Sequence, residues 1–119
     1  MTYSIEIDKV EIVVNIYQKS NRIDGYCEMA TTFIKNYSEN HKDSRIHVIA
    51  STKEEATNLE SLLISDLVVK KDEISVATSD ITKNLVKDIA DKWSKNLLKI
   101  LITTTLGKNI CLSFVTWFF

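Results

Sequence analysis

The sequence predicts a three-layer α/β domain, in which a mostly parallel sheet of about five strands has helices on both faces. Two observations predict this fold class. Short apolar segments rich in β-branched residues alternate with longer segments whose apolar residues recur at helical spacing. The connections between these segments have the ordinary length of loops in α/β units. The 119 residues suffice for one domain, which we expect to span residues 1–119.

Five segments are predicted strands because they concentrate apolar and β-branched residues. The segment at 98–110 begins as the unbroken apolar run that a strand buried on both faces requires. Its three consecutive threonines and a glycine then indicate a polar loop. The other predicted strands cover residues 10–17, 46–50, 73–77 and 114–119, and residues 1–9 are predicted to be irregular.

Three segments are predicted helices. The first spans about residues 25–38, where apolar residues recur at helical spacing. The second runs to about residue 63 and starts at Ser51 or Thr52, each of which has a glutamate three positions on, as in a capping box. The third has Asp80 as its expected N-cap and carries apolar residues at every fourth position up to Trp93.

An apolar strand at the end of the sequence is unusual, because chain termini are commonly polar and exposed. The segment 114–119 therefore indicates a truncated domain that continues beyond Phe119. The alternative is that the last strand docks in the centre of the sheet and ends there.

Composition excludes several classes of function. The formal net charge of −1 provides no general attraction for nucleic acid, so any such binding must come from local geometry. With two glycines and no proline, the chain can form neither a Walker A loop nor a dinucleotide-binding fingerprint. The chain therefore has no phosphate-binding loop of either kind.

The cysteines and the apolar tracts indicate an intracellular protein, nuclear if its source is a eukaryote. Cys27 and Cys111 lie far apart among apolar neighbours and are predicted to be buried free thiols in a reducing compartment. The N-terminus does not resemble a secretory signal. The longest apolar tract is too short to span a bilayer, so we expect no membrane association.

Metal and nucleophilic sites are not indicated. His41 and His47 have no cysteine or carboxylate at ligand spacing, and His47 is predicted to be a core or edge histidine. Cys111 has no neighbour that would lower the pKa of its thiol.

Two polar strand ends are candidate binding sites. Ser51 and Thr52 follow the strand at 46–50, and Thr103 and Thr104 end the strand that starts near residue 98. Hydroxyls at such positions, together with helix N-terminal amides, can hold phosphate oxygens. The alternative is that the first pair caps a helix and the second pair consists of ordinary strand residues.

The order of segments resembles the second RecA-like lobe of superfamily-two helicases, and within that group the RecQ-type DNA helicases. The strand followed by Ser51-Thr52 and a helix is similar to motif four. The run Leu101 to Ile110 is similar to motif five, in which a strand leads into Ala-Thr and Phe-Gly-Met-Gly-Ile-Asp. The resemblance extends over most of the chain and is carried by the segments 14–19, 45–56, 90–95 and 99–110.

This resemblance implies contacts with nucleic acid and with ATP. The hydroxyls of Ser51, Thr52, Thr103 and Thr104 would face the phosphate backbone of single-stranded DNA. A loop over 106–111 would approach ATP and its Mg²⁺, both held mainly by a first lobe that this sequence does not contain. The residues implied in that nucleotide contact are Gly107, Asn109 and Cys111.

The chain departs from the family at positions that matter for chemistry. Asn109 and Cys111 stand where motif five has glycine and aspartate, and Thr78 stands where RecQ proteins often have histidine. The motif with the arginine finger would lie beyond Phe119. Without that arginine and the Walker residues, the chain alone is expected not to hydrolyse ATP.

Two functions from different classes remain open. In the first, the chain is a fragment or degenerate copy of the C-terminal motor lobe of a RecQ-like 3′–5′ DNA helicase, which binds single-stranded DNA weakly. In the second, it is a non-catalytic module that binds a protein through its hydrophobic segment 114–119. A flavodoxin-like or receiver-like domain is disfavoured, because the acidic residues that a receiver gathers at its strand ends cannot be placed here.

Overall fold

The computed structural model describes the backbone of residues 2–7, 10–15, 23–42 and 45–114, and the side chains of residues 28–42 and 45–113. From β3 onward, strands and helices alternate as the sequence predicts. The elements are β1 (Thr2–Ile7), β2 (Val10–Asn15), α1 (Ile23–Asn40), β3 (Ile46–Ala50), α2 (Lys53–Ser65), the 3-10 turn η1 (Lys71–Glu73), β4 (Ile74–Ala77), α3 (Lys83–Ser94), β5 (Ile100–Thr104) and α4 (Thr105–Phe114).

The strands form one sheet in the order β2-β1-β3-β5-β4. β3, β5 and β4 are parallel, and Ile102 of β5 lies between Val48 of β3 and Val76 of β4. β1 runs antiparallel to both of its neighbours, β2 and β3. The predicted α/β class is therefore confirmed. The three parallel strands form one side of the sheet, and the antiparallel β1 and β2 form the other, so the sheet is mixed rather than mostly parallel as predicted.

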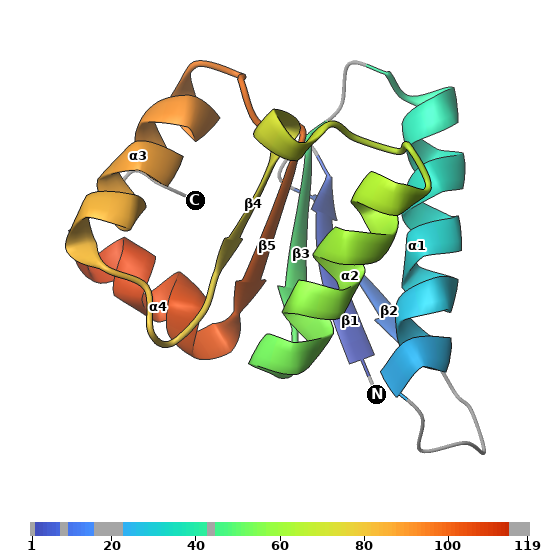
Figure 1. Cartoon of the computed structure of the whole chain (residues 1–119), viewed down its shortest axis with the longest axis horizontal. Helices are drawn as coiled ribbons and strands as arrows, with labels where there is room; N and C mark the ends of the chain where they lie inside the picture. Colours follow the sequence, from blue (N-terminus) through green and yellow to red (C-terminus); the bar gives the residue numbers. More distant parts are fainter. Residues whose placement is uncertain (1, 8–9, 16–22, 43–44, 115–119) are drawn as a thin grey trace.

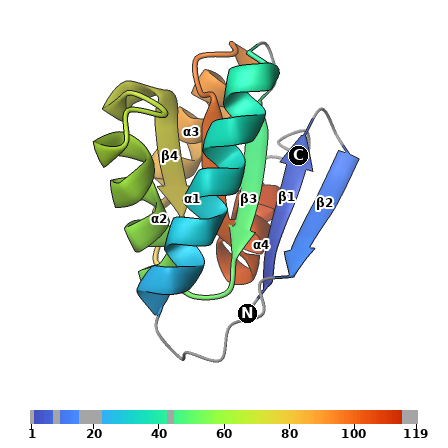
Figure 2. The same cartoon turned by 90° about the vertical axis from the view of Figure 1, so that its right-hand side faces the viewer.

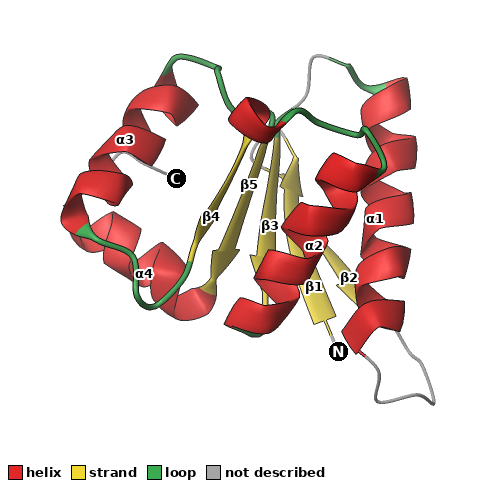
Figure 3. Cartoon of the chain, in the orientation of Figure 1, coloured by secondary structure: helices red, strands yellow, loops and turns green. Residues whose placement is uncertain are grey.

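Helices cover both faces of the sheet. α1 and α2 pack on one face, and α3 and α4 pack on the other (Figures 1 and 2). Figure 3 shows the strands as the middle layer between the two helix pairs. Leu101 joins the buried cluster under α3 and α4, whereas Ile102 joins the one under α1 and α2. Successive strand residues point to opposite faces, so β5 contributes to both cores.

The three predicted helices are confirmed as α1, α2 and α3. Thr52 is the N-cap of α2, and its hydroxyl accepts a hydrogen bond from the Glu55 N–H at 3.2 Å. The N-cap of α3 is Thr82 rather than Asp80, since the Thr82 hydroxyl accepts from the Leu85 N–H at 3.3 Å. The expectation for Asp80 was wrong because its carboxylate is bound to other side chains, described below.

Residues 1–9 were predicted to be irregular, but Thr2–Ile7 form β1. This strand lies inside the sheet and pairs with β2 on one side and β3 on the other. The residues of β1 alternate strictly between polar and apolar, which is typical of a half-buried strand, and the prediction overlooked this pattern.

The prediction of a polar loop after β5 is also wrong, because α4 begins directly at Thr105. The Thr104 hydroxyl accepts a hydrogen bond from the Gly107 N–H at 3.1 Å, which caps the first turn of the helix. Ile110 and Cys111 then pack into the core under α3 and α4. Phe114 is the last residue of α4 rather than the start of a strand, and the rest of that predicted strand, residues 115–119, lies outside the described residues.

Candidate functional site

The most suitable place for a ligand is the carboxyl edge of β3 and β5. These two strands are neighbours, and α2 follows β3 on one face whereas α4 follows β5 on the other (Figure 1). Ligands of open α/β sheets bind at such topological switch points. Ala50 pairs with Thr104, so the chain leaves the sheet side by side at residues 51–53 and 104–105. We refer to these five residues as the switch-point edge.

Ser51 and Thr52 lie exposed on this edge, directly after β3. The Ser51 N–H donates to the Glu55 carboxylate at 3.2 Å, and the Thr52 hydroxyl accepts from the Glu55 N–H. Glu55 itself is buried, and its desolvation raises the pKa of the carboxyl group above the ordinary value. Helix capping and solvent exposure therefore occur together at this position.

Thr103 and Thr104 do not present their hydroxyls to solvent in the same way. Thr103 has no exposed surface, and its Oγ1 is hydrogen-bonded to Nε2 of the buried His47 at 2.8 Å. Thr104 is also buried and caps α4. The exposed residue at this strand end is Thr105, the first residue of α4, which the sequence reasoning did not single out.

The three residues implied in an ATP contact are not brought together on one surface. Gly107 is buried where α4 approaches β4, whereas Asn109 is exposed along the same helix. Cys111 is a buried free thiol, as predicted, and burial raises the pKa of that thiol. Two of the three residues are therefore buried, and the three do not form one surface that a nucleotide could contact. Cys27 lies in α1, outside the residues whose side chains are described.

Gly107 is required by a close approach of backbones. A Cβ at this position would lie 2.1 Å from the carbonyl oxygen of Ala77 and 2.9 Å from the Cα of Thr78. The first turn of α4 therefore rests directly on the carboxyl end of β4, which fixes where the N-terminus of α4 points.

An ion pair crosses the same edge. Lys53 at the start of α2 and Asp80 after β4 form a contact of 2.5 Å between Nζ and Oδ2. The Thr78 hydroxyl also donates to Asp80. The bond to Lys53 and then the bond to Thr78 hold the pKa of Asp80 down at about 2. Because β5 lies between β3 and β4, this pair joins the loops on either side of β5. Residue spacing gave no signal for it, since it depends on strand order.

Within the stretches 28–42 and 45–113, no group of three or more histidine, cysteine or carboxylate side chains is placed to hold a metal ion. In the described part of the chain, no helix combines the length and the apolar character needed to cross a membrane.

Comparisons of this chain with protein-family models, with curated proteins and with solved structures found no match.

Proposed function

We propose that this chain is a fragment or degenerate copy of a RecQ-like helicase C-terminal lobe that binds the phosphate backbone of single-stranded DNA at the switch-point edge. The observation that carries the proposal is the exposure of Ser51 and Thr52 beside the carboxyl end of β5. The N-termini of α2 and α4 both lie at this edge. Helix N-termini favour negative charge, and hydroxyls and amides are common phosphate contacts.

The residues proposed to contact DNA differ from those that the sequence implied. Ser51 and Thr52 remain, and Thr105 replaces Thr103 and Thr104, whose side chains are buried. Lys53 is the cation of the edge, and it carries an ion pair with Asp80. Since a single lysine would neutralise about one phosphate, log K should fall with log salt with a shallow slope of about −0.7.

We propose that this chain contacts ATP and Mg²⁺ only when it is paired with a first lobe that is encoded elsewhere. The two glycines of the sequence cannot supply a Walker A loop, so we expect no ATP hydrolysis by this chain alone. The interaction with that lobe, DNA repair and an intracellular or nuclear location remain part of the same proposal.

The test is anisotropy of a labelled oligothymidylate at low salt. The double variant Ser51→Ala/Thr52→Ala removes both exposed hydroxyls and should weaken binding at least tenfold, because even one hydrogen bond to a charged group contributes about 1.5–3 kcal/mol and about 1.4 kcal/mol is tenfold. Thr82→Ala is the matched control, since Thr82 caps α3 as Thr52 caps α2 but lies outside the switch-point edge. No binding by the parent chain, or equal affinity of the double variant and the parent, would refute the proposal.

The alternative function is a protein-interaction module that binds its partner through residues 114–119. Phe114 ends α4 and the remaining five residues are not described, so no observation favours that segment.

A further inference from the structure

Glu55 is a buried carboxylate directly behind the exposed hydroxyls of the switch-point edge. It is 3% exposed, whereas Ser51, Thr52 and the neighbouring Glu54 are exposed. Its Oε2 accepts a hydrogen bond from the Ser51 N–H at 3.2 Å, and its own N–H donates to the Thr52 hydroxyl at 3.2 Å. Glu55 therefore contacts both of the residues that are proposed to bind phosphate.

The Glu55 carboxylate and a bound phosphate would compete for the same groups. The backbone amides around the start of α2 carry partial positive charge that favours an anion, and the Ser51 N–H already donates to the carboxylate. A phosphate held by Ser51 and Thr52 would place a second negative charge beside the first. Because Glu55 is buried, water screens this repulsion less than it does at an exposed carboxylate.

We propose that Glu55 sets the affinity of the switch-point edge for phosphate, and that DNA binding is coupled to the uptake of one proton by its carboxyl group. The proton comes from solvent, and no bond of the DNA changes. The neutral acid keeps an oxygen that can accept from the Ser51 N–H, so the start of α2 stays intact. This inference rests on the proposed DNA binding and adds a specificity-determining residue to it.

Burial and the surrounding charges set the pH at which Glu55 takes up its proton. Desolvation by burial is the largest influence and raises the pKa of Glu55 above 4.5. The Ser51 N–H, the ammonium group at the N-terminus and the Thr52 N–H act in the opposite direction, and the charge of Glu54 adds to the rise. Affinity for DNA is therefore expected to increase as the pH falls from about 7 toward 4.5.

The other charges around this edge keep their state over that interval. Asp80, which is paired with Lys53, has a pKa of about 2 and stays ionised. An N-terminal ammonium titrates at about pH 7.7–8.0 and stays protonated. The buried residues in the described part of α1, the helix packed beside α2, carry no charge; they are Ala30, Thr31 and Ile34.

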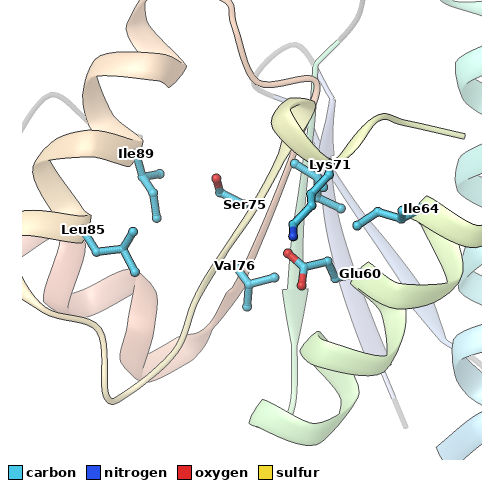
Figure 4. Close-up of a pocket in the computed structure, with 8 residues that line it drawn as sticks. Glu60, Ile64, Lys71, Ser75, Val76, Leu85 and Ile89 are labelled. Atoms are coloured by element: carbon cyan, nitrogen blue, oxygen red, sulfur yellow. The ribbon is translucent and has the colours of Figure 1, made fainter.

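Glu60 supplies a matched comparison within the same helix. Burial raises the pKa of its carboxyl group too, and Lys71 acts to lower it. The two side chains point toward one another at a groove of about 350 Å³ between α2 and α3 (Figure 4). Glu60 therefore shares the helix and the buried setting of Glu55 but lies outside the switch-point edge.

The test compares the affinity of each variant with that of the parent for labelled oligothymidylate, by anisotropy at low salt. Glu55→Gln removes the charge and keeps an acceptor for the Ser51 N–H. It should bind about fivefold more tightly than the parent at pH 7, and the ratio should fall to about one at pH 4.5, where the parent is also neutral at this position. Comparison with the parent at each pH removes the effect of overall protein charge.

Two controls remove one carboxylate each from other places on α2. Glu54→Gln acts on an exposed neighbour, and Glu60→Gln acts in the groove. Both should stay within about twofold of the parent at both pH values, because solvent or distance weakens their effect on the phosphate. A ratio for Glu55→Gln that is the same at both pH values, or no larger than in the controls, overturns the inference and leaves DNA binding in place. Absence of binding by the parent at every pH overturns both.

The Ser51 amide gives a direct readout of the proton. Its N–H donates to Oε2 of Glu55, so its NMR chemical shift follows the ionisation of that carboxyl group. Coupling between two binding events is reciprocal, so a fivefold effect on affinity moves the titration midpoint by the logarithm of that factor. The midpoint should rise by about 0.7 pH units in saturating oligothymidylate. An unchanged midpoint contradicts proton uptake by Glu55.

Discussion

Lys53 and Asp80 meet across the carboxyl end of β5, with Nζ and Oδ2 2.5 Å apart, although 27 positions separate them in the chain. Lys53 opens α2 after β3, and Asp80 lies in the connection from β4 to α3. The ion pair therefore ties together the loops that leave the two strands flanking β5.

The Asp80→Asn variant tests the contribution of this ion pair to stability. The pKa of Asp80 is lowered from 3.8 to about 2, so the carboxylate is favoured in the folded state. A lowered carboxyl pKa stabilises the fold above pH 3.8, and this contribution disappears as the pH falls toward 2. Urea unfolding at several pH values should show the parent losing stability relative to Asp80→Asn over this interval. Parallel curves for the two proteins would contradict the assignment.

The same variant has a second readout in DNA binding. Asp80 neutralises Lys53 and places a negative charge near the proposed phosphate contact. Its replacement by asparagine should tighten binding of oligothymidylate severalfold at low salt, and this gain should shrink as salt screens the charges. Unchanged affinity at low salt would show that Lys53 does not contribute to the site.

Gly107→Ala should destabilise the fold. The added Cβ would lie 2.1 Å from the Ala77 carbonyl oxygen, so α4 must move away from β4. Overpacking of this kind costs about 1–3 kcal/mol, which exceeds the gain of about 1 kcal/mol that alanine brings to a helix interior. Asn109→Ala is the control, because Asn109 is exposed in the same helix. The melting temperature of Gly107→Ala should lie below that of the parent, and the melting temperature of Asn109→Ala should equal or exceed it.

Thr103→Val separates a structural threonine from a binding one. Valine keeps the shape of the side chain but removes the hydrogen bond to Nε2 of His47 in the core. We expect a loss of about 1–3 kcal/mol in the free energy of unfolding, because a buried polar partner loses its bond. DNA affinity, measured where the variant is fully folded, should equal that of the parent. If Thr103→Val lost DNA affinity but no stability, the result would contradict this expectation and indicate that the Thr103 hydroxyl contacts DNA.

The contrast between Thr103 and Thr104 shows what residue spacing can and cannot establish. Consecutive residues of a strand point to opposite faces, so these two hydroxyls were never able to face one ligand together. Ser51 and Thr52 were placed well because a helix N-cap is a local feature with a local pattern. Each hydroxyl of the two threonines of β5 forms a hydrogen bond within the fold, Thr103 with His47 and Thr104 with Gly107.

Elements set by distant partners were the ones that the sequence did not reveal. β1 is an exception, because its residues TYSIEI alternate strictly between polar and apolar, which is the pattern of a half-buried strand that the prediction overlooked. Its place between β2 and β3 depends on distant segments. α4 was hidden by three β-branched threonines, which have low helix propensity and suggested continued strand and loop. The switch point and the Lys53–Asp80 contact depend on the order of strands in space, which no local pattern specifies.

The position of β5 also constrains how this chain can acquire its structure. β5 separates β3 from β4, yet it is the last of the three to be synthesised. Until residue 104 has emerged from the ribosome, the two earlier parallel strands have no common neighbour with which to form hydrogen bonds. The pairing of Val48 with Ile102 spans 54 positions, and long-range closure of this kind slows folding. The nascent chain must therefore complete its central layer from the outside inward.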